Sequence, residues 1–259
     1  MLNLRLPNLR YDRIYWVLFL VIIVVILIGA ITRKRNSYPN STEVNVVALA
    51  NGEKLISEGD VRQALLRAFG NDLENTEIAT LDVERMERVM EEDPFVEDAE
   101  TYVDQNNILH VEIRQRAPML RILDQNGGNY YLDDKGIKMP PSNNFTARVL
   151  VATGNIAPYT PEFMQKKRNT LKDLVTITKA ILKDPFLADC IQQVHVNNAG
   201  EFILVPLIGD QKIILGNARR LENKFDRLKT FYKKAMPYVG WQQYRSINLK
   251  FNGQVVCKR

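Results

Sequence analysis

Histidine and cysteine are scarce in this sequence, which has two residues of each among 259. Cys190 and Cys257 lie far apart and form no Cys-x-x-Cys pair, so neither a zinc site nor a disulfide framework is expected. His110 and His195 belong to no His-Glu-x-x-His motif or His/Cys cluster, which argues against a catalytic zinc ion. A serine or cysteine nucleophile would also need one of these two histidines as its base. We therefore expect no enzyme, no metal and no cofactor.

Two further signatures of catalysis are missing. The 13 glycines form no glycine-rich phosphate loop. A glycosidase needs two carboxylates that face each other across a cleft. The acidic residues from 84 to 93 have instead the spacing of an exposed helix face, and they are Glu84, Glu87, Glu91, Glu92 and Asp93. We expect no small-molecule substrate.

Excess positive charge is absent from most of the chain. Residues 1–35 hold six basic residues and one acidic residue, which accounts for the whole net charge of +5. A nucleic-acid-binding domain would carry its basic excess on the folded part. The sequence therefore excludes nucleic acid as the expected partner.

One long apolar run is present, over residues 14–32, and contains no charge. At about 1.5 Å per residue it would span roughly 28 Å, the thickness of a bilayer core. A cleaved signal peptide is the alternative, but three basic residues follow the run instead of a small-x-small cleavage site. The expected flanks of this membrane anchor are Arg13, Tyr15, Trp16, Arg33, Lys34 and Arg35. Three basic residues lie on each side of the apolar run, so the charge count leaves the orientation of the membrane helix undecided. Residues 1–13 are expected to form a short tail before it.

The region after the anchor predicts a small α+β module over residues 43–118. Alternation of apolar residues predicts strands, and apolar spacing of three to four predicts helices. The expected order is strand 43–49, helix 57–69, helix 81–92, strand 95–103 and strand 108–116.

Residues 119–259 predict a mostly antiparallel β domain with flanking helices. The expected elements are strands at 119–124, 129–132, 190–196, 202–207, 211–215 and 246–258, and helices at 160–183 and 219–236. Asp-Pro occurs at 93–94 and 184–185, and each pair is expected to end a helix and begin a strand.

The two predicted domains have opposite charge. Residues 43–116 hold 7 Lys and Arg against 18 Asp and Glu, whereas residues 119–259 hold 22 against 11. Three explanations fit this split. Each domain's charge only keeps that domain solvated, the two domains attract each other, or the two domains bind separate partners of opposite charge. The basic residues of the last helix fit a solvated face or an acidic partner, and they are Arg219, Arg220, Lys224, Arg227, Lys229, Lys233 and Lys234.

Three motifs carry a family resemblance. Residues 90–118 end in Arg116-Ala117-Pro118, residues 131–136 read Tyr-Leu-Asp-Asp-Lys-Gly before Thr153-Gly154, and residues 247–251 read Ile-Asn-Leu-Lys-Phe. In this order, after one membrane helix, they resemble the FtsQ (DivIB) family, in which a POTRA domain precedes a β domain. Asn248 and Lys250 depart from that family's Val-Asp-Leu-Arg-Tyr pattern.

The resemblance implies a non-enzymatic scaffold that links early and late cell-division proteins at the septum. It implies a single-pass inner-membrane protein with a cytoplasmic N-terminus and periplasmic domains. The partners implied are an FtsB/FtsL-like complex on the last strand, and other division proteins on the POTRA-like module and membrane helix. A POTRA-bearing assembly or secretion factor and a membrane-anchored peptidoglycan hydrolase are the alternatives.

The last strand, over residues 246–258, is expected to be the docking edge because no later strand follows it to cover its backbone groups. The resemblance places Phe251 where the family has a partner-contacting tyrosine. The expected partner-binding residues are Ile247, Asn248, Leu249, Lys250, Phe251, Gln254 and Val255. Alternatively, the apolar residues of this strand complete the core.

Overall fold

A computed structural model of the protein describes residues 11–70 and 73–259. The chain divides into two compact units. The first unit consists of Met1–Val46, Glu58–Glu92 and Asp98–Ile113, and the second of Val47–Ser57, Asp93–Glu97 and Arg114–Arg259. The domain limits expected from the sequence, 43–118 and 119–259, stay predictions.

Helix α1 (Tyr11–Arg35) contains the apolar run. Its segment Tyr15–Thr32 is long and apolar enough to cross a membrane, and none of it is buried by the described protein. A signal sequence would pass the same test of length and composition. Residues 1–10 of the predicted tail, and the side chains of Arg13, Arg33 and Arg35, lie outside the described residues.

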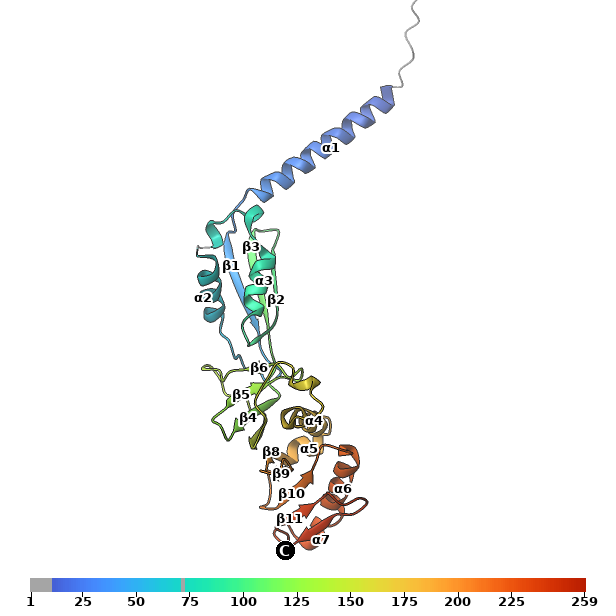
Figure 1. Cartoon of the computed structure of the whole chain (residues 1–259). Helices are drawn as coiled ribbons and strands as arrows, with labels where there is room; N and C mark the ends of the chain where they lie inside the picture. Colours follow the sequence, from blue (N-terminus) through green and yellow to red (C-terminus); the bar gives the residue numbers. More distant parts are fainter. Residues whose placement is uncertain (1–10, 71–72) are drawn as a thin grey trace, which may run out of the picture. The chain divides into compact units, whose positions relative to one another are not determined.

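The rest of the first unit is built around a three-stranded sheet in the order β1-β3-β2 (Figure 1). The elements follow the predicted order: β1 (Ser41–Val47), α2 (Glu58–Phe69), the 3-10 turns η1 (Leu73–Asn75) and η2 (Ile78–Thr80), α3 (Val83–Glu91), β2 (Val96–Val103) and β3 (Ile108–Gln115). The predicted strand-helix-helix-strand-strand pattern is confirmed.

Apolar periodicity explains these elements. Leu109, Val111 and Ile113 alternate along β3 and are fully buried, as predicted. Val61 and Leu65 lie one turn apart on α2 and are buried as well. Each such side chain stabilises the fold by about 1.5–3 kcal/mol when it leaves water.

The second unit has a nine-stranded sheet in the order β12-β11-β10-β9-β8-β7-β4-β5-β6. Its elements are β4 (Leu120–Asp124), β5 (Asn129–Leu132), β6 (Lys138–Met139), β7 (Leu150–Gly154), η3 (Phe163–Gln165), α4 (Thr170–Leu182), α5 (Pro185–Cys190), β8 (Ile191–Val196), β9 (Phe202–Pro206), β10 (Lys212–Gly216), α6 (Leu221–Lys234), α7 (Met236–Val239), β11 (Ser246–Asn248) and β12 (Val256–Lys258). Three neighbouring pairs, β4–β7, β7–β8 and β10–β11, are parallel, and the other five pairs in the described sheet are antiparallel. The mostly antiparallel α+β prediction is thus confirmed.

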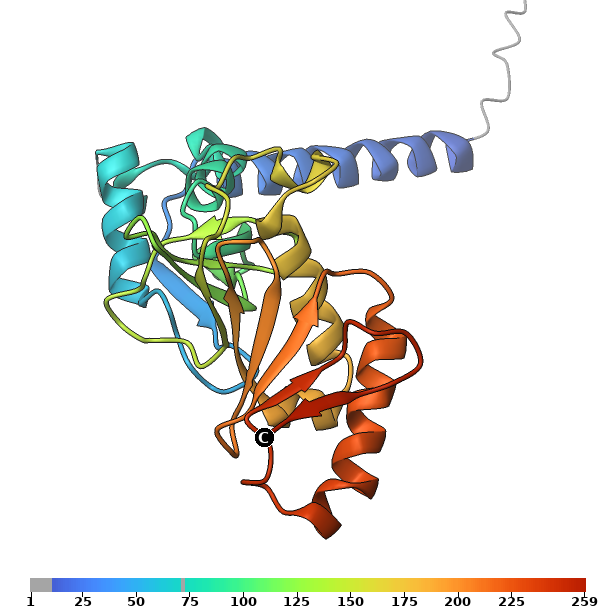
Figure 2. The same cartoon turned by 60° about the horizontal axis from the view of Figure 1, so that its bottom comes forward.

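One apolar core joins this sheet to its helices. Leu174 of α4 and Leu228 of α6 are buried in the same cluster as Leu204 of β9 and Ile213 of β10. Figure 2 shows α6 beside the strands that end the chain. Packing against α6 therefore fixes the C-terminal part of the sheet.

The predicted helix 160–183 begins later than expected. Helix α4 starts at Thr170, and only η3 lies in the earlier part. Oδ1 of Asn169 accepts hydrogen bonds from the backbone N–H of Leu171 at 2.8 Å and of Lys172 at 3.2 Å. This side-chain cap sets the helix start, where the sequence suggested Pro161.

The second Asp-Pro pair starts a helix instead of a strand. Asp184 caps α5, because its Oδ1 accepts from the backbone N–H of Phe186 at 3.1 Å, and Pro185 occupies the first turn. Strand β8 begins only at Ile191. The expectation that this pair begins a strand directly was wrong.

Candidate functional site: the C-terminal hairpin

The last part of the chain is a hairpin of two short strands. β11 pairs in parallel with β10 and antiparallel with β12, so the single strand expected over residues 246–258 was wrong. The connection between the strands includes Gly253, whose φ of +73° lies in the left-handed region that favours glycine. We call residues 246–258 the terminal hairpin.

The structure separates the predicted partner-binding residues into three groups by burial. Ile247 and Leu249 are fully buried in the core of the second unit. Asn248 and Val255 are half-buried, and Val255 packs against that core. The remaining three, Lys250, Phe251 and Gln254, are exposed.

The exposed aromatic ring and the outer strand are the accessible parts of the hairpin. Phe251 is 48% exposed and Val256 of β12 is 42% exposed. β12 has one neighbour, β11, in the described sheet, so its other side offers unpaired backbone N–H and C=O groups. The open edge at this end of the described sheet is therefore β12, which is shorter than the strand predicted from the sequence.

A basic cavity of about 520 Å³ lies beside the hairpin. Its lining includes five basic side chains, from Arg219, Arg220, Lys224, Arg227 and Lys250. Glu201 is the one acidic residue among the lining residues in the described part of the chain. Such a cavity suits an acidic group.

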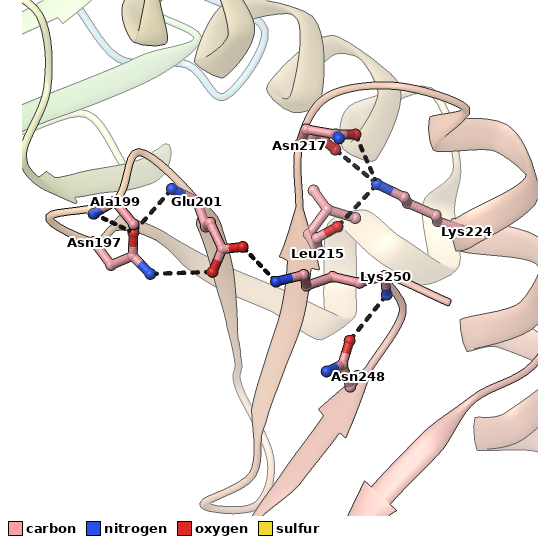
Figure 3. Close-up of polar contacts among 8 residues, drawn as sticks. All are labelled: Asn197, Ala199, Glu201, Leu215, Asn217, Lys224, Asn248 and Lys250. Carbon is pink, nitrogen blue, oxygen red and sulfur yellow. Dashed lines mark hydrogen bonds and ion pairs between the residues drawn. The ribbon is translucent and has the colours of Figure 1, made fainter. Parts of the chain in front are cut away.

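Lys224 is a buried residue of the cavity lining. Its Nζ donates hydrogen bonds to the carbonyl oxygens of Leu215 at 2.9 Å and Asn217 at 2.8 Å, and to Oδ1 of Asn217 at 3.2 Å (Figure 3). Burial lowers the pKa of Lys224, and nearby Arg227 and Arg220 act in the same direction. Its hydrogen bonds fix the end of β10.

Lys250 connects the hairpin to the turn between β8 and β9. Its ammonium group pairs with Oε1 of Glu201, and Asn197 donates to Oε2 of the same carboxylate at 3.4 Å (Figure 3). The hydrogen bond from Lys250 lowers the pKa of Glu201. The Lys250 side chain passes Gly216, where an added Cβ would lie 2.8 Å from Lys250 Cγ.

Asn248 fills the role of a turn cap. Its Oδ1 accepts a hydrogen bond from the backbone N–H of Lys250 at 2.9 Å. Asparagine and aspartate both provide this acceptor. The departure from the family's aspartate at this position therefore preserves the local turn.

Four of the seven basic residues predicted on the last helix form hydrogen bonds or ion pairs within the second unit. Nη1 of Arg220 donates to Oδ1 of Asn252 at 3.3 Å. Lys224 and Arg227 donate to backbone carbonyls. Nζ of Lys229 pairs with Asp184 at 2.6 Å and with Asp226 at 3.0 Å. The helix is thus only partly a solvated face. Its Lys/Arg spacing was visible in the sequence, but the backbone acceptors were not.

The anchor flanks can be placed only in part. Tyr15 and Trp16 are 69% and 71% exposed on α1, and Lys34 is also exposed. Aromatic rings of this kind favour the membrane–water interface. The predicted roles of all six flank residues remain predictions.

The two histidines lie in different units. In the first, the His110 ring stacks on Tyr102 at 5.0 Å and lies 3.5 Å from Oδ2 of Asp104. In the second, Nδ1 of His195 lies 2.9 Å from Oγ1 of Thr153. Among the described residues, no three His, Cys, Asp or Glu side chains are grouped so that they could hold a metal ion.

Two family models match the sequence. The model described as FtsQ/DivIB, C-terminal related, matches residues 117–258, and the model described as a POTRA-like domain matches residues 40–114. No curated protein matches the chain significantly. The first match covers more than half of the chain.

Proposed function

Because the chain belongs to the FtsQ/DivIB family, whose domains support a division-associated scaffold role, we propose that it binds an FtsB/FtsL-like complex through its terminal hairpin. By this binding the chain would act as a scaffold that links early and late division proteins. Other division proteins would bind the POTRA-like module and the membrane helix.

The open edge of β12 is the observation that carries this proposal. An incoming strand gains main-chain hydrogen bonds to an unpaired edge, while its alternate side chains supply specificity. β12 ends the described sheet, and Phe251 offers an exposed aromatic anchor next to it. Buried aromatic anchors commonly dominate binding energy.

Charge beside the edge supports a partner with an acidic side chain. The cavity next to the hairpin is lined by five basic residues and one acidic residue. Arg219 and Arg220 are exposed there. Complementary charge raises the association rate and disfavours partners of the wrong sign.

The binding test compares Phe251→Ala and Val255→Pro with the parent chain. We expect Phe251→Ala to weaken binding of the FtsB/FtsL-like complex by about 2 kcal/mol, roughly thirtyfold, with the fold retained. Proline at 255 perturbs the backbone that leads into β12. Tyr238→Ala is the matched control, since Tyr238 is an aromatic residue of the same unit that is 89% exposed.

The measurement is the affinity of the full-length chain in nanodiscs, together with its thermal unfolding. If both hairpin variants stay folded and bind as tightly as the parent, the terminal hairpin is not the docking edge. If both unfold, the hairpin serves the core and the interface lies elsewhere. Truncating Ile247 is not informative, because loss of a fully buried side chain costs about 2–5 kcal/mol of stability by itself.

We also propose that the protein is a single-pass inner-membrane protein with its N-terminus in the cytoplasm and its domains in the periplasm. Helix α1 supports an anchor, and long domains translocate despite flanking charge. An alkaline-phosphatase fusion at the C-terminus should be active, and a fluorescent protein that matures only in the cytoplasm should stay dark. The reverse pattern contradicts this topology.

The FtsQ/DivIB family is non-enzymatic, and we propose the same for this chain. A peptidoglycan hydrolase would release muropeptides from purified sacculi, and we expect none. An assembly or secretion factor would co-purify with envelope assembly proteins. Division proteins are the co-purifying partners expected here.

A further inference from the structure

Three basic residues at the start of α6 and within it donate hydrogen bonds to neighbouring segments of the second unit. Lys224 and Arg227 are three residues apart on α6, which places them on one side of the helix, and Arg220 is the N-cap residue with a φ of +51°. Nη1 of Arg220 donates to Oδ1 of Asn252 at 3.3 Å. Lys224 binds carbonyls at the end of β10. The third residue, Arg227, binds the connection between β11 and β12.

Arg227 donates to three backbone carbonyls of that connection. Its Nη1 donates to the carbonyl oxygens of Phe251, at 2.7 Å, and of Gln254. Its Nη2 donates to the carbonyl oxygen of Leu249 at 3.2 Å. Residues 249–255 belong to neither strand, so their carbonyls receive no sheet hydrogen bonds of the usual kind. The guanidinium of Arg227 donates hydrogen bonds to three of these carbonyl oxygens instead.

Other contacts already hold the start of the hairpin. The backbone N–H of Leu249 donates to the carbonyl oxygen of Ile214 at 2.9 Å, and the Leu249 side chain is fully buried. From Lys250 to Gln254, by contrast, every residue is exposed. The conformation of this exposed stretch therefore depends on Arg227 more than on packing.

We propose that Arg227 is the positioning residue of the docking edge. It holds residues 249–254 in one conformation, and so presents Phe251 and β12 ready for a partner strand without contacting the partner. Fixing a binding segment in its bound conformation removes an ordering cost from binding. The inference rests on the proposed function, because it assigns a role within the same docking site.

A lysine cannot replace this arginine. The guanidinium is a planar fork with donors on several nitrogens, whereas lysine offers one ammonium on a flexible stem. Arg227→Lys keeps the charge and loses the geometry. Arg227→Gln loses both. If both variants bind the partner equally weakly, the geometry of the guanidinium is what matters. If only Arg227→Gln binds more weakly, the positive charge is what matters.

The experiment has two arms, both with the full-length chain in nanodiscs. The first measures backbone hydrogen exchange without any partner. In both variants, exchange should become faster in residues 250–258 and stay unchanged in β8 and β9. The second measures affinity for the FtsB/FtsL-like complex, which should fall about tenfold if the competent conformation drops to about a tenth of the population. Lys234→Gln, an exposed position on the same helix, is the control for lost charge and should match the parent in both arms.

Three results would overturn the inference. Unchanged exchange in residues 250–258 means that Arg227 does not position the hairpin, and weaker binding would then reflect direct contact with the partner. Parent-like binding by Arg227→Lys assigns the effect to charge. Loss of protection throughout β8 and β9 assigns Arg227 to the stability of the whole unit. Failure of the proposed function is distinct, because the parent chain itself would then not bind the complex.

Discussion

Nη1 of Arg116 lies 2.9 Å from Oδ2 of Asp133, and both side chains are nearly inaccessible to solvent. Arg116 also donates from Nη2 to the carbonyl oxygen of Val96 at 2.7 Å. The other carboxylate oxygen of Asp133 accepts from the backbone N–H of Ile137 at 2.6 Å. All four residues belong to the second unit. The Arg-x-Pro and Leu-Asp-x-x-Gly motifs of the sequence are thus two halves of one buried pair.

Asp133→Asn should destabilise the second unit strongly. Removing one partner of a buried ion pair leaves the other charge uncompensated, at a cost of about 3–5 kcal/mol. Asp134→Asn is the control, because Asp134 is the exposed neighbour. Urea unfolding of the two variants measures the difference. Equal midpoints for Asp133→Asn and the parent would contradict a structural role for the pair.

Gly216→Ala should disturb the contact between Lys250 and Glu201. Gly216 has a φ of +77°, and an added Cβ would lie 2.8 Å from Lys250 Cγ. Gly200 is a matched control with a φ of +75° and nothing within 4 Å of an added Cβ. Backbone strain of about 1 kcal/mol or more is expected at both positions. Thermal unfolding should therefore show a larger loss for Gly216→Ala, and equal losses would show that Lys250 moves aside freely.

The fold could be predicted from the sequence where local periodicity decides the structure. Alternation of Leu109, Val111 and Ile113 marked β3 correctly, because a half-buried strand exposes every second residue. The first residues of the helices were harder to predict from the sequence. The signal for α5 was present, since aspartate followed by proline is a typical helix start, but the same pair also fits a helix end.

The terminal hairpin could be predicted only in outline. The sequence placed it at the C-terminus, but the alternation of Ile247, Leu249 and Phe251 suggested one strand where the chain turns after Leu249. The turn is held by carbonyl oxygens that accept from Arg227, some 22 to 27 residues away. Every residue carries a carbonyl oxygen, so the sequence does not indicate which of these oxygens accept hydrogen bonds from Arg227.

Acid should weaken the contact between the hairpin and the β8–β9 turn. The hydrogen bond from Lys250 lowers the pKa of Glu201 below its usual value of 4.5. A carboxylate with a lowered folded-state pKa stabilises the fold above its unfolded pKa, and this contribution disappears as the pH falls through the folded pKa. The pair is partly exposed, so the effect should be about 1 kcal/mol or less. Urea unfolding at a series of pH values from neutral to acid should show that the free energy of unfolding falls less steeply in Glu201→Gln than in the parent. Identical dependence on pH in the two proteins would contradict a stabilising role for the pair of Lys250 and Glu201.

Charge reversal on the POTRA-like region should slow the association of its division partners. Residues 43–116 hold 18 acidic against 7 basic residues, and a strongly charged surface raises the association rate at low salt. Glu91, Glu92 and Glu100 are exposed residues of the first unit and suit the reversal to lysine. Glu97 is a poorer choice, because its carboxylate pairs with Lys135 at 2.9 Å, which lowers its pKa, and its loss would disturb the second unit.

The measurement is the association rate of co-purifying division proteins with the full-length chain in nanodiscs. At low salt the triple reversal should slow association on the order of tenfold, and high salt should slow the parent to a similar rate because ions screen exposed charges beyond roughly 8 Å. The matched control reverses three exposed acidic residues of the second unit, Glu162, Asp210 and Glu222. Since that unit is basic overall, reversing these three charges should not slow the association of the same partners. A parent rate that is equal at low and high salt would leave the acidic surface without a role in steering, and its charge would then serve solvation alone.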